Sequence, residues 1–242
     1  MPLMAEKVLL SWSGGKDSAL ALYEIKERQD MEIVSLITTI TEDYDRVSMH
    51  GVRRVLLENQ AEFLGIPLYN IFISKDASDE AYGHKMKEML TRFSRLGVTA
   101  VVFGDIFLED LRRFREKQLS KVGMKGIFPL WRKDTTELAN TFINLGFRAI
   151  ITSADSKVLN REFVGREIDK KFLAQIPPAV DPCGENGEFH SFVFSGPTFE
   201  KRVCFRVGEV VFRENRFYYC DLVPVFPAQS LLATEHGKSG EC

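Results

Sequence analysis

The sequence predicts an α/β fold in which a doubly wound parallel sheet is followed by a smaller α+β domain. Three observations support this prediction. Apolar runs typical of strands alternate with helical patterns over the first 130 residues, as expected for a parallel sheet with helices on both faces. A glycine-rich turn follows the first strand and opens a helix. Beyond residue 130 the pattern changes to loops and short strands.

Apolar runs rich in β-branched residues predict the five strands of the parallel sheet, at residues 8–10, 33–37, 68–73, 100–103 and 127–128. Helical spacing of apolar residues fills the intervals, at residues 19–25, 52–64, 79–96 and 107–122. Gly65 and Gly97 stand where two of these helices should stop. Ligands of such sheets bind beyond the carboxyl ends of the strands, where the strand order reverses. We therefore expect the site in the loops that follow the strands, near residues 12–18, 38–50, 74–78 and 104–110.

The second half predicts a helix at 135–145, a strand at 147–152 and a helical piece at 166–174. A loop dense in glycine and acidic residues follows. Three short strands in an antiparallel arrangement come next, near residues 192–194, 203–212 and 217–222. We therefore predict a first domain at 1–130, a second domain at 131–227 and a disordered tail at 228–242, where periodicity is lost.

Composition limits the function classes. The net charge of −2 lacks the basic footprint that is usual for nucleic-acid binders. Four cysteines without C-x-x-C spacing argue against a disulfide framework or a zinc ribbon and favour a reducing, cytoplasmic compartment. No signal peptide is evident, and no apolar run approaches the roughly 18 residues of a membrane span. We expect no membrane partner, and the sequence is compatible with a homo-oligomer.

The turn after the first strand reads Ser-Gly-Gly-Lys-Asp-Ser, at residues 13–18. Main-chain N–H groups at a helix start point at a ligand, and the helix dipole favours an anion, so this turn predicts a phosphate-binding loop. Gly14 and Gly15 let the chain approach a phosphate closely. Lys16 can place a positive charge on a phosphate oxygen. Ser13 and Ser18 can donate hydroxyl hydrogen bonds.

Asp17 is an acid at an anion site, which needs a reason. Binding a Mg²⁺ ion that bridges to phosphate is one reason, and charge complementarity with the helix N-terminus is the plain alternative. The spacing differs from the common G-x-x-x-x-G-K-[ST] loop, because the lysine directly follows the two glycines.

Residues 13–18 resemble the signature of the PP-loop ATP pyrophosphatases. The resemblance implies a HUP-like α/β domain that cleaves ATP to AMP and pyrophosphate and adenylates a substrate, which a nucleophile then attacks. Further segments resemble the diphthine–ammonia ligase family, so that the likeness covers most of residues 7–195. They are residues 49–51, 60–68, 103–106 with Arg112 and Arg113, 129–131 and 184–191.

The segment 184–191, Gly-Glu-Asn-Gly-Glu-Phe-His-Ser, is similar to that family's G-E-x-G-E-[FY] stretch. Family members often read G-E-G-G-E-[FY]-E-T, so Asn186, His190 and Ser191 depart from the pattern. An acid is lost where the acceptor would sit, which bears on the substrate more than on the ATP chemistry.

The resemblance implies an ATP-dependent ligase that forms an amide. A substrate carboxylate would attack the α-phosphorus of ATP, and ammonia would attack the resulting acyl-adenylate. The implied catalytic residues are Lys16, Asp17, Glu185 and Glu188, with Mg²⁺ held by Asp17. The acceptor would be diphthine on an elongation factor if the source makes diphthamide, and otherwise another carboxylate. A tRNA-modifying PP-loop enzyme and a non-catalytic ATP sensor are the alternatives.

Other candidate site residues have a purely structural explanation as well as a functional one. Thr38 ends the second strand, His50 follows the loop after that strand, and Gly104 with Asp105 ends the fourth strand, where the nucleotide should bind; a surface histidine, a tight turn and a helix cap are the alternatives. Glu185 and Glu188 can serve the amine step or be solvated loop acids.

Three further features are less specific. His190 can be a base or a half-buried strand residue. The basic stretch from Arg112 to Lys125 can grip pyrophosphate or an acceptor, or form a solvated helix face. Cys183 can carry sulfur, and we prefer an ordinary buried thiol.

Overall fold

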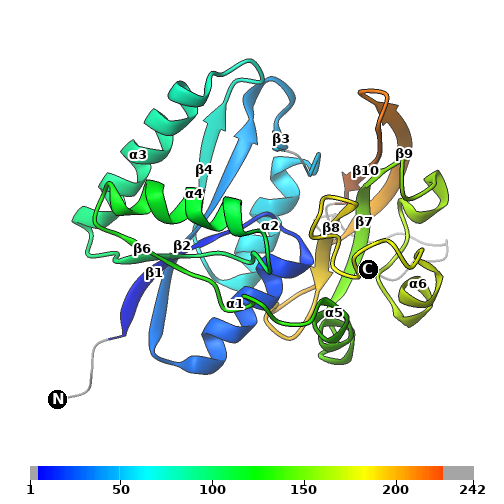
Figure 1. The fold of residues 1–242 in the computed structure, drawn as a ribbon, viewed down its shortest axis with the longest axis horizontal. Coiled ribbons are helices and arrows are strands. Elements are labelled where there is room, and N and C mark those ends of the chain that lie inside the picture. The colour runs from blue at the N-terminus through cyan, green and yellow to red at the C-terminus, as the bar shows by residue number, and fades with distance from the viewer. Residues whose placement is uncertain (1–4, 49, 226–242) are drawn as a thin grey trace, which may run out of the picture.

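The computed structural model describes residues 5–48 and 50–225. Sheet A contains six strands of the first half: β1 (Glu6–Ser11), β2 (Met31–Thr41), β3 (Arg46–Val47), β4 (Leu68–Ile73), β5 (Ala100–Val102) and β6 (Lys125–Ile127). Five of them are parallel, in the spatial order β4-β2-β1-β5-β6, and β3 pairs antiparallel with the end of β2. The order reverses between β1 and β5, because the chain returns from β4 to the other side of β1 (Figure 1).

Two layers of helices cover sheet A, namely α1 (Lys16–Arg28), α2 (Arg54–Leu64), α3 (Asp79–Arg95) and α4 (Glu109–Ser120). Strand β1 shows how the layers arise, since its buried residues alternate between the two faces. Leu9 packs in a cluster with residues of α3 and α4. Val8 and Leu10 pack in a second cluster with residues of α1 and α2. The parallel sheet is therefore buried on both faces, as its apolar strands require.

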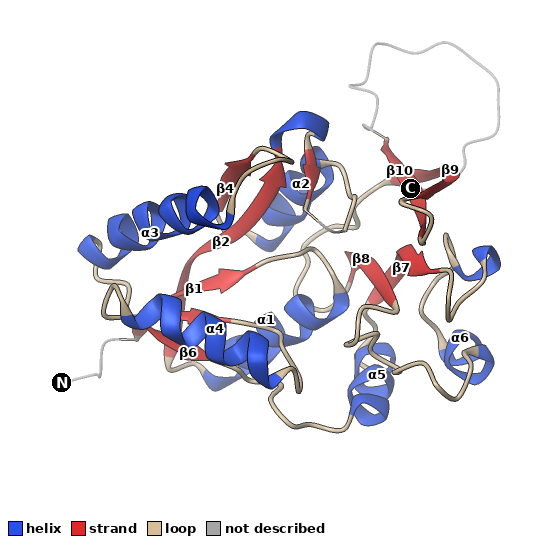
Figure 2. Cartoon of the chain, turned by 45° about the horizontal axis from the view of Figure 1, so that its top comes forward, coloured by secondary structure: helices blue, strands red, loops and turns tan. Residues whose placement is uncertain are grey.

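Sheet B is antiparallel and belongs to the second half. Its strands β7 (Arg148–Asp155), β8 (Phe189–Ser195), β9 (Phe205–Arg213) and β10 (Phe217–Pro224) stand in the order β8-β7-β10-β9. Helices α5 (Thr135–Asn144) and α6 (Lys170–Gln175) lie beside this sheet (Figure 2). Two 3₁₀ turns, η1 (Glu42–Tyr44) and η2 (Arg161–Phe163), complete the described elements.

The two sheets share one buried cluster. It runs from Leu10 in β1 through α1 and α2 to Phe192 in β8 and Leu222 in β10. A main-chain hydrogen bond joins the sheets directly, because Val193 N–H donates to the Gly14 carbonyl at 2.8 Å. Sheet B thus closes over the glycine-rich turn that follows β1.

The predicted α/β class, the five parallel strands and the antiparallel second half are confirmed. Gly65 ends α2 with a φ of 66°, in the left-handed region expected of a helix stop. The helix predicted at 166–174 starts late, at Lys170, because the Asp169 carboxylate caps it by accepting from Phe172 N–H at 2.6 Å. Strand β3 was not predicted, since two residues carry no periodicity.

Some predictions concern other parts of the chain. The tail at 228–242, including Cys242, lies outside the described residues. The boundary near residue 130 falls between β6 and α5 and stays a prediction. Among residues 5–48 and 50–225, no helix is long and apolar enough to span a membrane.

Candidate active site

The glycine-rich turn lies between β1 and α1, beside the point where the strand order reverses. Gly14 has a φ of 77°, which only glycine adopts without strain, and Gly15 is the N-cap of α1. No side chain caps this helix start. The turn is shaped by hydroxyl groups: Gly15 N–H donates to Ser13 Oγ at 3.2 Å, and Ser18 Oγ donates to the Gly15 carbonyl at 2.9 Å.

Gln60 of α2 holds the turn from the protein interior and is wholly buried. Its Oε1 accepts from the Trp12 indole N–H at 2.8 Å. Its Nε2 donates to the carbonyls of Gly14 at 3.0 Å and Val193 at 2.5 Å. One amide side chain thus ties the turn to α2 and to β8. No role was predicted for Gln60, and the signals for one were its place in the family-like segment 60–68 and its polar side chain within an apolar helical pattern.

Strand β8 supplies a second support for the turn. Lys16 N–H donates to Ser191 Oγ at 3.2 Å. A Cβ atom added at Gly15 would lie 3.1 Å from the Ser191 carbonyl, so β8 passes close against the turn. Ser191 stands where the family pattern has threonine, and its hydroxyl supplies the contact that a threonine hydroxyl could also supply.

Lys16 and Asp17 form an ion pair in which the lysine side chain is buried and the carboxylate is partly exposed. The ammonium nitrogen lies 2.7 Å from both carboxylate oxygens and also donates to the Cys183 carbonyl. Burial works to lower the pKa of Lys16, but Asp17, together with Cys183 and Glu185, outweighs burial, and the pKa is raised. Burial raises the pKa of Asp17, although Lys16 works to lower it. The raised pKa by itself would favour the neutral carboxylic acid. The 2.7 Å contacts, with 28% of the Asp17 side chain exposed, favour an ionised pair.

The ammonium group of Lys16 is therefore occupied in this structure. Only 3% of the Lys16 side chain is exposed. To contact a phosphate oxygen, the nitrogen has to exchange the Cys183 carbonyl, or Asp17, for the new ligand. A raised pKa keeps the charge that this exchange requires.

We call residues 181–188 the Gly-Glu loop, and Glu185 fastens it to the loop that follows β5. The Glu185 carboxylate accepts from Ile106 N–H at 2.7 Å and from Phe107 N–H at 3.3 Å. Burial raises its pKa to about 7, against the effect of the Ile106 N–H and with a contribution from Asp17. Glu185 can therefore gain and lose a proton near neutral pH.

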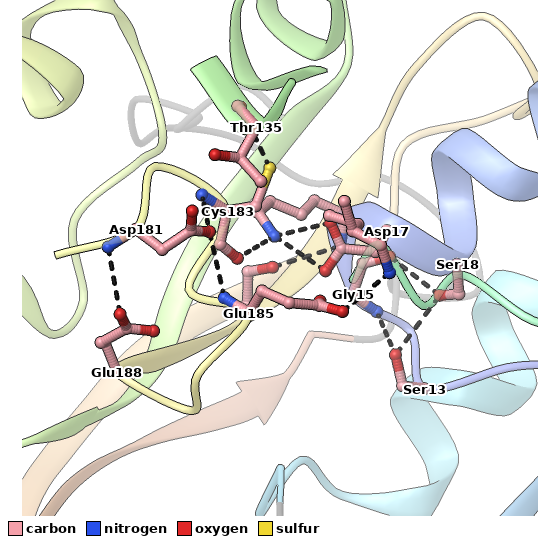
Figure 3. Close-up of polar contacts among 12 residues, drawn as sticks. Ser13, Gly15, Asp17, Ser18, Thr135, Asp181, Cys183, Glu185 and Glu188 are labelled. Carbon is pink, nitrogen blue, oxygen red and sulfur yellow. Dashed lines mark hydrogen bonds and ion pairs between the residues drawn. The ribbon is translucent and has the colours of Figure 1, made fainter. Parts of the chain in front are cut away.

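Glu188 organises the Gly-Glu loop internally. Its buried carboxylate accepts from Asp181 N–H and from both nitrogens of Asn186, each at 3.0 Å. Asp181 adds to the same framework, because its Oδ1 accepts from Cys183 N–H at 2.9 Å. Figure 3 shows Glu188 apart from Asp17. The geometry thus separates two glutamates that the sequence treated alike.

The loop after β5 packs directly on the start of α1. A Cβ atom added at Gly104 would lie 2.8 Å from the carbonyl carbon and oxygen of Asp17, which leaves room only for glycine. Asp105 pairs with Arg115 of α4 at 2.7 Å, and burial raises its pKa against the effect of that arginine. Asp105 does not cap α4, whose N-cap is Leu108.

One prediction about a neighbouring element needs correction, and the basic stretch has contacts within the protein. Thr38 does not end the second strand, because β2 continues to Thr41, which pairs with Ile73 of β4. Thr38 is buried and lies just beyond Ile37, the last partner of β1. Part of the basic stretch contacts other side chains of the protein. The Arg112 guanidinium carbon lies 4.8 Å from the Phe128 ring centre and 4.6 Å from that of Trp131.

Comparison with known proteins links both halves to one family. The diphthamide synthase N-terminal domain matches residues 6–126, and the diphthamide synthase C-terminal domain matches residues 134–222. This chain belongs to the diphthamide synthase family. Residues 13–18 lie within the first match and the Gly-Glu loop within the second, so both sides of the candidate site come from segments that define the diphthamide synthases.

Several relatives share the name diphthine–ammonia ligase. The protein from Schizosaccharomyces pombe is 30% identical over 227 residues, which cover 85% of this chain and 37% of that relative. The Danio rerio protein is 24% identical, covering 84% of this chain and 88% of its own length, and the Homo sapiens protein is 22% identical, covering 82% of both. This chain therefore spans little more than a third of the yeast protein.

One solved structure, the U34-tRNA thiolase NcsA from Methanococcus maripaludis, shows a distant likeness. It is 16% identical with a TM-score of 0.36 over 59% of each chain.

The candidate site of this chain suits ATP better than it suits a metal ion bound by protein side chains alone. The glycine turn and the start of α1 suit phosphate oxygens, and the Gly15 and Lys16 N–H groups there now donate to the hydroxyls of Ser13 and Ser191. Within the described parts of the chain, no group of three His, Cys, Asp or Glu residues could hold a metal ion. Mg²⁺ commonly takes only one or two protein carboxylates and completes its ligands with phosphates and water. Asp17 can supply such a carboxylate if it leaves Lys16.

Cys183 and two surface hollows lie outside this chemistry. Burial raises the pKa of the Cys183 thiol to about 12, and the thiol donates to the Thr135 carbonyl at 3.3 Å. It is therefore a poor nucleophile. The hollows lie between α3 and α4 and between α5 and α6, and none of the predicted site residues lines them.

Proposed function

We propose that this chain is an ATP-dependent ligase that adenylates a carboxylate acceptor and then transfers ammonia to it. The observation that carries the proposal is the convergence of the two signature segments on one buried charge cluster. The glycine turn contributes Lys16 and Asp17, and the Gly-Glu loop contributes Glu185 and the Cys183 carbonyl. A cluster that joins a phosphate loop to a titratable acid suits a reaction with a phosphate leaving group and a proton to remove.

In the first step, an acceptor carboxylate oxygen bonds to the α-phosphorus of ATP, and the bond to the β-phosphate oxygen breaks. Gly14, Gly15 and the start of α1 bind the phosphates. Lys16 exchanges the Cys183 carbonyl for an oxygen of the leaving pyrophosphate. Asp17 would then hold Mg²⁺, which supplies charge neutralisation at the phosphates.

In the second step, ammonia attacks the acyl-adenylate carbonyl, so that AMP leaves and an amide forms. The attacking nitrogen must lose a proton, and Glu185 can accept it because its pKa is about 7. Glu188 positions Glu185 by holding the Gly-Glu loop in shape. We propose the carboxylate of diphthine on an elongation factor as acceptor in a source that makes diphthamide, following the names of the relatives.

Product analysis tests this proposal. The pure protein is incubated with ATP, Mg²⁺, ammonium and a diphthine-bearing elongation factor, and nucleotides and the modified residue are quantified. We expect AMP, pyrophosphate and the amide. Lys16→Met should lower the rate at least about a hundredfold, because a charge at the leaving group is lost. Lys26→Met, on the exposed end of the same helix, is the matched control and should keep the full rate.

Other products decide against the proposal. ADP with inorganic phosphate would refute cleavage between the α and β phosphates. ATP binding without any turnover would instead support the alternative of a nucleotide sensor. A tRNA-modifying activity that uses a cysteine is not favoured, since the Cys183 thiol is buried and held in its protonated form.

A further inference from the structure

A second polar cluster lies where the two sheets meet, around the side of β8 that carries His190. It consists of His50, Ser153, His190 and Tyr219, and we call it the two-histidine cluster. Ser153 pairs directly with His190 of β8 and with Tyr219 of β10. Directly paired residues share a face of a sheet. His50, from the segment between β3 and α2, stacks on that face with its ring centre 4.3 Å from that of His190.

The cluster is held in place from both halves of the chain. A Cβ atom added at Gly51 would lie 3.0 Å from Cδ1 of Tyr219, so the segment that carries His50 packs on the tyrosine ring. Arg46 and Arg53 flank this segment, and both pair with Asp221 of β10, at 2.9 Å and 2.7 Å. The geometry of the cluster is therefore preformed rather than dependent on one flexible contact.

Two polar atoms of the cluster lack a hydrogen-bond partner among the described residues. They are Nδ1 of His50 and Oγ of Ser153, and both are buried. Ser153 is only 1% exposed. Buried polar atoms in native proteins are nearly always hydrogen-bonded, so these two atoms are available to a ligand group or to ordered water. The Gly-Glu loop shows the contrast, since the Glu188 carboxylate accepts three hydrogen bonds.

The cluster carries no charge at neutral pH. Burial lowers the pKa of His190 to about 4 and that of His50 well below its usual value, and the charge of Lys16 adds to both shifts. A neutral imidazole has one donor and one acceptor nitrogen, and a serine hydroxyl both donates and accepts. A charged group costs more to bury beside uncharged partners than an uncharged group does, so an uncharged ligand group suits this set best.

We propose that the two-histidine cluster binds an uncharged group that both donates and accepts hydrogen bonds, such as a carboxamide or a heteroaromatic ring. Two sources can present this chemistry next to the proposed reaction centre, the base of the nucleotide or the acceptor. The acceptor source rests on the proposed function, and the nucleotide source requires only ATP binding. His190 is also a position where the chain departs from the family pattern, so the cluster is a feature in which this chain differs from relatives with glutamate there.

Binding measurements on three variants test the proposal. Ser153→Ala and His50→Phe each remove one orphan atom while keeping the apolar or aromatic bulk. Thr198→Val is the matched control, because Thr198 Oγ1 is also a buried hydroxyl without a partner among the described residues. Thr198 lies in the loop after β8, whereas His190 lies near the start of that strand. Calorimetry measures the dissociation constants for α,β-methylene-ATP, for its guanine counterpart and for a diphthine-bearing elongation factor. Thermal unfolding checks that each variant is folded.

The outcomes separate the two sources. If the cluster binds the base, both variants should bind the adenine nucleotide about tenfold more weakly, as expected for one lost hydrogen bond, and should lose preference over guanine. If it binds the acceptor, nucleotide affinity should stay unchanged and acceptor affinity should fall about tenfold. Thr198→Val should change neither.

The proposal is overturned if both variants match the wild type within twofold for every ligand that the wild type binds, in which case the orphan atoms meet only water. These readouts need no turnover, so a failed ligase reaction with weakened nucleotide binding would refute the proposed function and leave the cluster assignment standing. If both variants bind every ligand as the wild type does and the ligase is active, the cluster assignment is refuted and the proposed function stands.

Discussion

Glu185 and Glu188 show how environment assigns different tasks to identical residues. Both glutamates belong to the Gly-Glu loop and stand three positions apart. The Glu188 carboxylate accepts hydrogen bonds from N–H groups of its own loop. Glu185 reaches across to the loop after β5, near Asp17, and its pKa rises to about 7 through burial. Only the second arrangement suits proton transfer at neutral pH.

Replacing Glu185 by glutamine tests this assignment through pH. The base must be ionised, so kcat/KM of the wild type should rise with pH through about 7 and then level off. Glu185→Gln should lose that rise and at least about a hundredfold in rate, the lower end of what a proton-transfer group typically contributes. The amide oxygen can still accept from Ile106 N–H, which limits structural damage. An unchanged inflection in the variant would assign the proton transfer to another group.

Stability should carry the same signature. A carboxyl whose pKa is raised from 4.5 to about 7 holds its proton more tightly in the folded state. Its contribution to the free energy of unfolding is therefore fully present below pH 4.5 and is lost as pH rises through about 7. Urea unfolding across that window should show a decline in the wild type that is smaller in Glu185→Gln.

The sequence predicted some of the loops that meet at the candidate site, but not the side chains that hold them together. The turn at 13–18, the loop after β5 and the Gly-Glu loop do come together. The roles of Gln60, Asp181, Ser153 and Ser191 were missed. Each depends on partners far along the chain or on main-chain atoms, such as the contact of Gln60 with Val193. Such contacts leave no spacing pattern in a single sequence.

At the scale of elements, the approach of the β5 loop to α1 depends on one missing side chain. Gly104→Ala would place a methyl group 2.8 Å from the Asp17 carbonyl and 3.0 Å from Ser18 N, which forces backbone apart. We expect a loss of about 1–3 kcal/mol in the free energy of unfolding, as for other overpacked sites. We also expect at least tenfold weaker ATP binding, because the start of α1 is displaced.

Gly83→Ala is the matched control. Gly83 lies within α3, and an added Cβ atom would have no neighbour within 4 Å. Alanine should therefore stabilise the helix by about 0.5–1 kcal/mol. Urea unfolding of both variants and nucleotide titration check the pair. Equal effects at the two positions would show that the close approach at Gly104 is not structural.

The elements themselves were largely predictable, because burial on both faces of sheet A and the amphipathic helices leave strong patterns. The failures are instructive. Strand β3 is two residues long and exists only because β2 extends past β1 and offers it a free edge. The start of α6 was placed early, since Glu167 bridges to Ile150 of β7 instead of entering the helix. Both errors come from tertiary pairing that overrides local pattern.

At the scale of the whole molecule, the sequence suggests two domains and the packing suggests one cooperative unit. A single buried cluster links β1, α1 and α2 to β8 and β10. The Val193 to Gly14 hydrogen bond and the ion pairs of Arg46 and Arg53 with Asp221 add polar links between the halves. A site built from both halves needs such coupling, because its geometry depends on their relative position.

We therefore expect the chain to unfold in one transition. Calorimetric and van't Hoff enthalpies should agree, and hydrogen exchange should give the most protected amides of β1 and β7 the same opening free energy. Phe192→Ala removes a fully buried ring of β8 and should lower that free energy by about 3–5 kcal/mol in both strands. Phe212→Ala, at a side chain 50% exposed on β9, should cost less than about 0.5 kcal/mol. Loss of protection confined to β7 in Phe192→Ala would mean that sheet B opens independently. The reaction centre would then have to be assembled by ligand binding.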